Sequence, residues 1–359
     1  MTRAATVAEA LARPHNGFSG LRLALALAVV VSHAFSVTSG NALDEPLART
    51  TGFTLGEHAV NGFFAVSGFL VAMSFDRRGL VDYLISRTLR ILPGLVAATL
   101  TVALVLGAAM STLPFGDYFG DGGVWRFVRG TLTTFKSNAS LPGVFPDNPY
   151  RSPLGTVWTL KYEVLCYGGV IGAGLLGALR RRWTVLLVAL GFALALVIAD
   201  ATHPDLPKGL ETALRLPLIF AIGTALYTGR DRLRLSVVPL AILALACVLA
   251  QHGPLYRTLL FAAEGYGTIW LGLSPWLARK AFDPRADLSY GIYLYGWPVQ
   301  QSLHALWPGA SAPSLLPPAL ALTAFVAAAS WYGVERPALR LKTRTLGRRM
   351  LGTIEPAGP

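Results

Sequence analysis

The sequence has little charge and almost no cysteine. Only 14% of its 359 residues are charged, whereas 53% are hydrophobic, and the mean hydropathy is +0.51. A typical soluble domain has about 25% charged residues, so this composition excludes an ordinary soluble protein. The two cysteines, Cys166 and Cys247, lie in apolar runs without CxxC or Cys/His spacing. Neither a disulfide framework nor a zinc site is indicated, and we expect no metal.

Acidic residues are also few, with 19 Asp and Glu against 31 Lys and Arg, which gives a formal net charge of +12. In a soluble chain this excess would raise the question of nucleic-acid binding. Here the basic residues lie in short connections between apolar runs, where they set topology and meet anionic lipid headgroups. We therefore expect membrane lipids, and no nucleic acid, among the partners.

The sequence contains many long apolar runs. Windows of about twenty residues, the length that crosses a bilayer, predict spans at 19–38, 59–75, 90–110, 154–176, 183–200, 210–228, 235–250, 256–277, 288–306 and 315–334. The predicted fold class is therefore all-α, a polytopic membrane protein with about ten transmembrane helices.

The positions of the basic residues predict the orientation of these spans. Most Lys and Arg fall in the N-terminal segment, the even-numbered connections and the C-terminal tail, which places both termini in the cytoplasm. The predicted parts are a cytoplasmic segment 1–18, a membrane domain 19–337 and a basic tail 338–359. The long connection 111–153 then lies on the outer side. It is either a lid or substrate-facing loop, or an inert surface loop.

Titratable side chains inside the predicted spans need a reason, because each costs several kcal/mol unless it is paired or hydrated. They are His33, Lys161, Glu163, Arg215 and Glu264. For any one of them alone, a structural ion pair is as good an explanation as a functional role. Lys161 and Glu163 are two residues apart, about 200° around a helix, so they do not satisfy each other.

The first span combines an arginine and a histidine. Arg22 and His33 are eleven residues apart, so both project from one helix face with a separation of roughly 16 Å along the axis. With both termini cytoplasmic, Arg22 lies at the cytoplasmic mouth and His33 toward the outer half. A guanidinium suits phosphate or carboxylate recognition, and a histidine transfers protons near neutral pH.

Further patterns follow in a fixed order: SGF at 67–69, SRTLRILPG at 86–94, GTVWTLKYEVLCY at 155–167, DLSYGIYLYGWPVQQ at 287–301 and SWYGVERPALRLK at 330–342. Together with Arg22 and His33, this ordered set resembles the acyltransferase 3 family of membrane O-acyltransferases, which modify bacterial surface and secreted carbohydrates. The similarity runs from Arg22 to Lys342.

The resemblance implies a multi-pass protein of the bacterial cytoplasmic membrane. Its donor would be cytoplasmic acyl-CoA, usually acetyl-CoA, and its acceptor a hydroxyl of a glycan or lipid-linked saccharide. In that family the arginine and histidine of the first span are required for activity, and they map onto Arg22 and His33. The basic turn maps onto Arg87 and Arg90, and the acid of the WTL-x-x-E pattern onto Glu163.

The ninth span resembles the SYGIYLY run of the family through Ser289 and Tyr290, which we expect, with Lys161, to contact substrate. Many members have a histidine directly before the Trp-Pro or Phe-Pro that follows. This chain has Gly296 at that position, which concentrates the catalytic hypothesis on His33.

The mechanistic hypothesis has the three arginines Arg22, Arg87 and Arg90 holding the phosphates or carbonyl region of acyl-CoA. His33 is then either a general base for the acceptor hydroxyl or a transient acyl carrier. Glu163 either orients the imidazole or pairs with a cation. A secondary transporter or flippase is the alternative function, but it would show inverted repeats, and none is visible; a non-catalytic scaffold would tolerate replacement of the polar residues.

Overall fold

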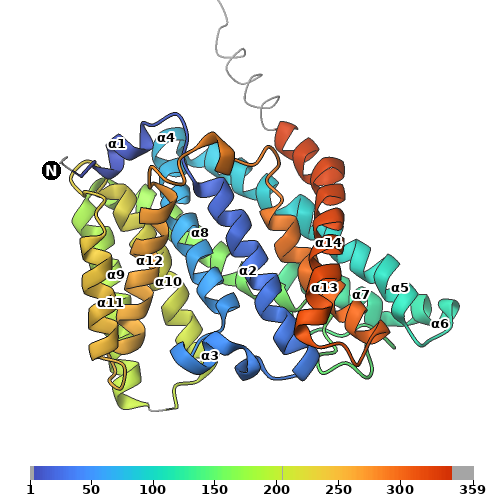
Figure 1. Ribbon diagram of the computed structural model, residues 1–359. Coiled ribbons are helices and arrows are strands. Elements are labelled where there is room, and N and C mark those ends of the chain that lie inside the picture. The colour runs from blue at the N-terminus through green and yellow to red at the C-terminus, as the bar shows by residue number, and fades with distance from the viewer. Residues whose placement is uncertain (1–3, 204, 342–359) are drawn as a thin grey trace, which may run out of the picture. The chain divides into compact units, whose positions relative to one another are not determined.

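Helices make up the regular structure of the computed structural model, which describes residues 4–203 and 205–341 (Figure 1). Within these ranges no strand forms beyond two isolated bridges, Thr6 with Arg234 and Ser111 with Val144. The prediction of an all-α protein is confirmed. The far part of the predicted basic tail, residues 342–359, lies outside the described residues.

Eight of the ten predicted apolar runs coincide with a separate helix whose bounds differ by a few residues, and the runs 59–75 and 90–110 both fall in α4 and its continuation. The long helices are α2 (Phe18–Ser39), α4 (Leu55–Leu100), α8 (Trp158–Leu175), α9 (Arg182–Thr202), α10 (Lys208–Thr228), α11 (Val238–Leu249), α12 (Tyr256–Gly272), α13 (Ser289–Leu306) and α14 (Ala312–Ser330). Short helices are α1 (Val7–Leu11), α3 (Pro46–Thr51), α5 (Gly107–Met110), α6 (Phe115–Gly120) and α7 (Gly122–Thr134).

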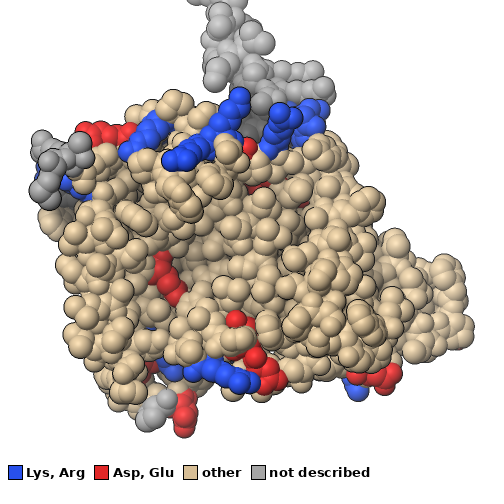
Figure 2. Space-filling view, viewed as in Figure 1, with Lys and Arg blue, Asp and Glu red and all other residues tan. Residues whose placement is uncertain are grey.

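Five helical segments of the described chain are long and apolar enough to cross a membrane: Phe18–Ser39, Leu55–Met110, Trp183–Thr202, Lys208–Thr228 and Ala312–Leu341. The other predicted spans coincide with helices that are shorter or less apolar. Figure 2 shows wide areas of surface without any Lys, Arg, Asp or Glu side chain, as lipid contact requires. The chain is a helical membrane protein, and the count of about ten spans stays a prediction.

The second and third predicted spans are not separated by an irregular turn. Both belong to α4, whose helical geometry is interrupted at Gly79, where φ is +77° and ψ is 177°. Glycine adopts this backbone region at little cost, so the chain breaks there and resumes a helix at once. The basic segment 86–94 is therefore helical and continues through the π-helical turn η2 (Thr101–Leu106) into α5.

The chain divides into two compact units, each assembled from three segments. Unit 1 consists of residues 1–29, 51–77 and 159–285, and unit 2 of residues 30–50, 78–158 and 286–359. Helices α2 and α4 contribute one half to each unit.

Unit 1 contains α8 to α12, in which α10 packs on α9 and α12, and α11 packs on α12 (Figure 1). Helix α10 also crosses the first half of α4 at backbone contact. A Cβ added to Gly68 would lie 2.0 Å from the Phe220 carbonyl oxygen, and one added to Gly223 would lie 2.1 Å from that of Ala65. Any larger side chain at either glycine would push the two helices apart.

Unit 2 contains α13 packed on α14, and the chain segment 111–153. This segment is partly helical, because α7 has an amphipathic face whose buried members are Val124, Phe127 and Thr131. Burial raises the pKa of Tyr118 to about 12, and its hydroxyl donates to the Ala103 carbonyl at 2.6 Å. The predicted loop is thus a folded part of unit 2.

Candidate functional site

Helix α2 carries the arginine and the histidine that the sequence analysis singles out. It runs without interruption from Phe18 to Ser39, and both side chains are half-buried. The prediction that Arg22 and His33 share one helix holds, and helix geometry places them on one face. His33 belongs to the part of α2 that lies in unit 2.

The imidazole of His33 lies against an indole. Its ring centroid is 5.0 Å from that of Trp297 on α13, and the two planes meet at 85°. The His33 Nδ1 atom is buried and has no hydrogen-bond partner among the described residues. A buried nitrogen without a partner costs about 1–3 kcal/mol, and such groups call for a functional explanation.

Helix α13 is fixed directly to α2 near this histidine. The Gln300 side chain donates from Nε2 to the Val30 carbonyl at 2.7 Å. A Cβ on Gly296 would lie 2.6 Å from Cγ2 of Val30. Close packing on α2 therefore explains a glycine at the position where the resemblance leads one to expect histidine, because a larger side chain would displace α13.

The last part of the 111–153 segment and the residues after it attach to the C-terminal half of α13. Asn148 donates from Nδ2 to the Gln301 side-chain oxygen at 2.7 Å and to its carbonyl at 2.9 Å. Gln301 in turn donates from Nε2 to the Tyr150 carbonyl at 2.9 Å. Both glutamines of α13, Gln300 and Gln301, are fully buried. Their amides replace the hydrogen bonds that water would supply outside the membrane.

The same attachment continues toward His33. Trp297 donates from Nε1 to the Ser152 carbonyl at 2.7 Å, and Tyr293 donates to the Thr156 carbonyl at 2.9 Å. The Tyr150 ring lies 5.3 Å from the Trp297 ring. Residues 148–156 thus form a strap, here called the α13 strap, that holds the indole contacting His33. Both interpretations of the segment 111–153, a lid or substrate-facing loop and an inert surface loop, stay predictions.

Three further predicted residues come together at the other end of unit 2. The Arg90 guanidinium pairs with the Asp287 carboxylate at 2.9 Å, and the Ser289 hydroxyl donates to the same carboxylate at 2.6 Å. Arg90 also lies 5.7 Å from the Tyr290 ring centre, whose hydroxyl donates to the Ile91 carbonyl at 3.0 Å. Arg90, Ser289 and Tyr290 form one cluster around Asp287.

Two other predicted residues show less specific surroundings. Arg87 lies one turn before Arg90 on α4 and is half-buried. Lys161 is exposed, with its ammonium 4.8 Å from the ring centre of the neighbouring Tyr162. A cation over an aromatic ring is a modest contact at an exposed site, so Lys161 remains available to a ligand.

Glu163 belongs to a small hydroxyl cluster within unit 1. Its carboxylate accepts a short hydrogen bond from Tyr167 and a longer one of 3.3 Å from Ser67. The Ser67 hydroxyl also lies 3.4 Å from that of Tyr167. Ser67 is the serine of the SGF pattern, so the structure joins two of the sequence patterns that carry the resemblance.

The other two intramembrane charges, Arg215 and Glu264, belong to a charged network in unit 1. Arg215 is fully buried, with Nε 2.8 Å from the Glu211 carboxylate, and it donates to the Asn61 side-chain oxygen at 3.3 Å. Asn61 donates to Glu264 at 2.6 Å, and Glu264 pairs closely with His58. This network stabilises three helices, α4, α10 and α12.

Sequence reasoning missed His58, Asn61 and Trp297. The predicted span begins at residue 59, whereas α4 begins at Leu55, so His58 falls just outside the predicted membrane segment. Trp297 appears in the sequence analysis only within the DLSYGIYLYGWPVQQ pattern. Its contact with His33 has no sequence signal, although its place next to the glycine of the YGWP pattern offers a hint.

The described residues contain no group of three or more His, Cys, Asp and Glu side chains that would hold a metal ion. An apolar pocket between α8, α9 and α10 contains no general base either. The polar side chains that could bind a substrate or take part in a reaction are instead those around His33, around Asp287 and around Glu163.

Comparison with known proteins finds relatives that match most of the chain. An O-acetyl transferase of Shigella phage Sf6 is 26% identical over 89% of this chain and 95% of its own length. Nodulation protein 10 of Rhizobium leguminosarum bv. viciae is 28% identical over 93% and 96%. The exopolysaccharide production protein ExoZ of Rhizobium meliloti (strain 1021) is 28% identical over 82% and 93%.

No solved structure shows a significant match to the chain. The family profile described as an acyltransferase domain, however, matches residues 15–333. That range contains α2, the Asp287 cluster and the Glu163 cluster, and it leaves out only short terminal segments. The chain therefore belongs to the acyltransferase 3 family and is a membrane acyltransferase.

Proposed function

We propose that this protein transfers an acetyl group from cytoplasmic acetyl-CoA to a hydroxyl of a glycan or lipid-linked saccharide. Support comes from relatives whose names are O-acetyl transferase and exopolysaccharide production protein. The single observation on which the proposal rests is the imidazole of His33, which is buried in a membrane helix with Nδ1 lacking a protein partner.

In the proposed reaction His33 is the general base. It accepts the proton of the acceptor hydroxyl while the hydroxyl oxygen attacks the thioester carbonyl carbon. The carbon–sulfur bond then breaks, and the CoA thiolate leaves and takes the proton from the imidazolium. The products are the acetyl ester and CoA, and no other reactant is needed. Trp297 packs edge-to-face with the imidazole and restricts it to one orientation.

The basic residues bind the donor. Arg22 and Arg87 hold phosphate groups of CoA, because a guanidinium donates forked hydrogen bonds to them. Arg90 also contacts the donor, but its charge is already balanced by Asp287. Its contribution to donor binding is therefore the smallest of the three arginines. Ser289, Tyr290 and Lys161 contact the substrates, and Glu163 stabilises positive charge that develops during transfer.

The protein works in the bacterial cytoplasmic membrane with both termini in the cytoplasm. This orientation follows from the excess of Lys and Arg in the connections assigned to that side. The donor then reaches the protein from the cytoplasm, and the α13 strap lies on the outer side.

The direct test uses labelled acetyl-CoA with purified protein in liposomes that contain the lipid-linked saccharide fraction of the producing cells. We expect covalent label in the saccharide fraction, and a loss of about 10²- to 10⁴-fold in His33→Ala, the usual range for a general base. Arg22→Ala should raise the KM for acetyl-CoA. His203→Ala is the control, since His203 is exposed at the end of α9.

Two results would contradict the proposal. Movement of the lipid-linked saccharide between the two leaflets of the liposomes without covalent label indicates a flippase. Undiminished transfer by both His33→Ala and Arg22→Ala removes the site assignment, even if the protein is an acetyltransferase.

A further inference from the structure

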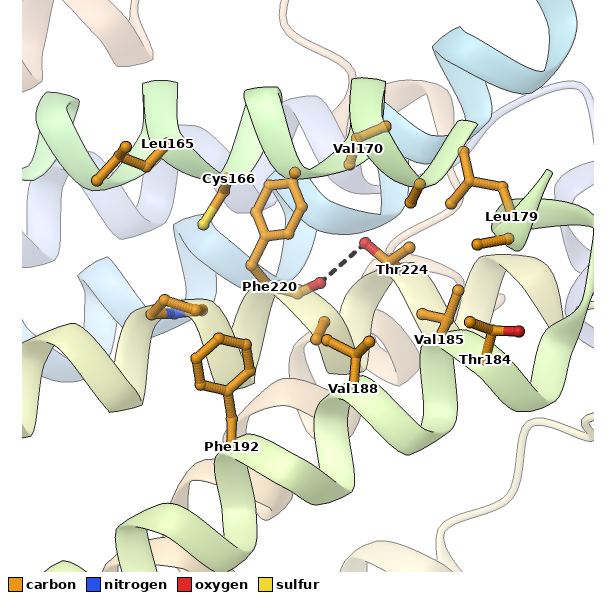
Figure 3. A pocket seen from close by; sticks show the side chains of 15 residues that line it. Leu165, Cys166, Val170, Leu179, Thr184, Val185, Val188, Phe192, Phe220 and Thr224 are labelled. Carbon is orange, nitrogen blue, oxygen red and sulfur yellow. Dashed lines mark hydrogen bonds between the residues drawn. The ribbon is translucent and has the colours of Figure 1, made fainter. Parts of the chain in front are cut away.

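An elongated apolar pocket lies between α8, α9 and α10 in unit 1, and no residue assigned to the proposed acetyl transfer lines it. Its volume is about 310 Å³, which is within the range of small-molecule sites. Figure 3 shows its walls. They are made by Leu165, Cys166, Gly169, Val170, Ala173, Ala178, Leu179, Thr184, Val185, Val188, Phe192, Pro217, Phe220, Ala221 and Thr224.

The pocket offers hydrocarbon and almost no hydrogen-bonding groups. The Thr224 hydroxyl donates to the carbonyls of Phe220 and Gly68, both at 3.1 Å, so it does not face a ligand. The remaining walls are aliphatic or aromatic apart from Thr184 and the Cys166 thiol. An occupant of this pocket therefore has to be apolar along its length.

The shape of the pocket suits a chain. Leu165 and Phe192 lie at one end in Figure 3, and Leu179 and Thr184 lie at the other. The pocket therefore follows the helix axes rather than crossing them. Leu165 is 69% exposed and Val188 is 49% exposed, so the pocket opens sideways at a surface that faces lipid in a membrane protein.

The connection between α8 and α9 carries two arginines, here called the basic rim, beside residues that line one end of the pocket. Arg180 and Arg181 follow directly after the lining residue Leu179 and precede the lining residue Thr184. Both arginine side chains are exposed. Basic residues at the membrane surface attract anionic headgroups, and the guanidinium donates forked hydrogen bonds to phosphate. An apolar slot that ends in two arginines is complementary to a molecule with a long tail and an anionic head.

We propose that this pocket is a binding site for an anionic glycerophospholipid. One acyl chain lies in the slot between α8, α9 and α10, and the lipid phosphate lies at Arg180 and Arg181. The site does not depend on the proposed acetyl transfer. It would fix α9 to α8 and α10 through the acyl chain, which replaces the side-chain contacts that the pocket lacks.

Two neighbouring glycines of α8 provide a matched pair of variants. A Cβ on Gly169, which lines the pocket, meets no atom within 4 Å, and the same holds for Gly168, which does not line it. Gly169→Leu therefore adds bulk at the slot with room for its first side-chain carbon, while Gly168→Leu adds the same bulk at a position that does not line the slot. Both changes replace glycine by a better helix former, so neither is expected to unfold the helix.

The experiment is native mass spectrometry of the full-length protein, delipidated and titrated with dioleoyl-phosphatidylglycerol or dioleoyl-phosphatidylcholine. We expect the wild type and Gly168→Leu to bind phosphatidylglycerol about tenfold more tightly than phosphatidylcholine. Gly169→Leu should lose about tenfold in affinity for both lipids. The double variant Arg180→Gln/Arg181→Gln should lose only the preference for phosphatidylglycerol.

The basic rim has its own control. Arg279→Gln/Lys280→Gln removes two exposed basic residues from another connection of unit 1 and should leave the lipid preference unchanged. Equal affinities of Gly169→Leu and Gly168→Leu would overturn the slot. Equal affinities of the wild type for the two lipids, or the same loss of preference in both double variants, would overturn the anionic headgroup site.

Discussion

A charged network in unit 1 and a single imidazole in unit 2 show two ways of burying titratable groups inside helices. In unit 1, Arg215, Asn61, Glu264 and His58 form a chain of partners in which each group contacts the next. In unit 2, His33 presents a buried Nδ1 without a hydrogen-bond partner among the described residues. The network offsets part of the desolvation of its charges with partners on neighbouring helices, whereas the His33 nitrogen has no such partner.

This difference separates structural from chemical roles. A buried charge that finds its partners on neighbouring helices stabilises the fold and is poorly placed to react, because a ligand would have to displace those partners. An imidazole nitrogen left without a partner is ready to accept a hydrogen bond from a substrate. The contrast therefore favours His33 over His58 as the reactive histidine, although both lie in long apolar helices.

The comparison predicts that breaking the unit 1 network harms stability first. In Arg215→Met the Glu211 carboxylate, which is 3% exposed, loses its guanidinium at 2.8 Å. Breaking a buried pair in this way costs about 3–5 kcal/mol, so we expect a marked fall in the thermal unfolding temperature in detergent. Any protein that remains folded should keep its acetyl-transfer rate per molecule.

Arg126→Met is the control for that variant. Arg126 lies 3.9 Å from the Asp121 carboxylate, and the two side chains are 74% and 42% exposed; such solvent-exposed pairs contribute only about 0–1 kcal/mol. Equal unfolding temperatures for the two variants would show that the network around Arg215 is not the structural element that the comparison assumes.

The α13 strap allows a test of the unit 2 half of the comparison, the positioning of His33. Trp297→Phe keeps an aromatic ring beside His33 but removes the Nε1 hydrogen bond to the Ser152 carbonyl, which is 2.7 Å long. One neutral hydrogen bond contributes about 1 kcal/mol, so we expect kcat to fall about fivefold, with little change in the KM for acetyl-CoA. Trp297→Ala should lower kcat further, because the imidazole loses its neighbour.

Trp331→Phe is the matched control, since Trp331 is also a largely buried tryptophan of unit 2. Its replacement should leave kcat within a factor of two. If Trp297→Phe and Trp331→Phe lower kcat equally, the strap supports the fold of unit 2 and does not position His33.

Much of this fold could be predicted because apolar runs of membrane length have few alternatives to a helix. The bounds of α2 and α10 lie within two residues of the prediction. The prediction failed where tertiary contacts decide. Segment 86–94 is helical because the interruption of helical geometry in α4 falls at Gly79. Helix α7 forms because its apolar face is buried.

The candidate site was predicted in its titratable members and in the residues of the family patterns. His33 and Glu163 stand out in the sequence because an apolar run makes any titratable group conspicuous, and Arg90, Ser289 and Tyr290 belong to patterns that carry the resemblance. The supports of His33 do not stand out, because Gln300 and Trp297 donate to the backbone carbonyls of Val30 and Ser152. Every residue has a carbonyl, so no residue type marks those acceptors.

The smallest predicted effect concerns Glu163, a predicted catalytic residue whose hydroxyl partners lie within unit 1. Ser67→Ala removes a hydrogen bond of 3.3 Å, whereas Tyr167→Phe removes the shorter one to the same carboxylate. Hydrogen bonds weaken as they lengthen beyond about 3.2 Å, so Ser67→Ala should change acetyl transfer by less than twofold and Tyr167→Phe by more. The assay is initial-rate transfer from labelled acetyl-CoA at saturating donor. A larger loss in Ser67→Ala than in Tyr167→Phe would mean that the serine contacts a substrate. Ser67 of the SGF pattern would then differ from the paired, structural polar groups of the unit 1 network.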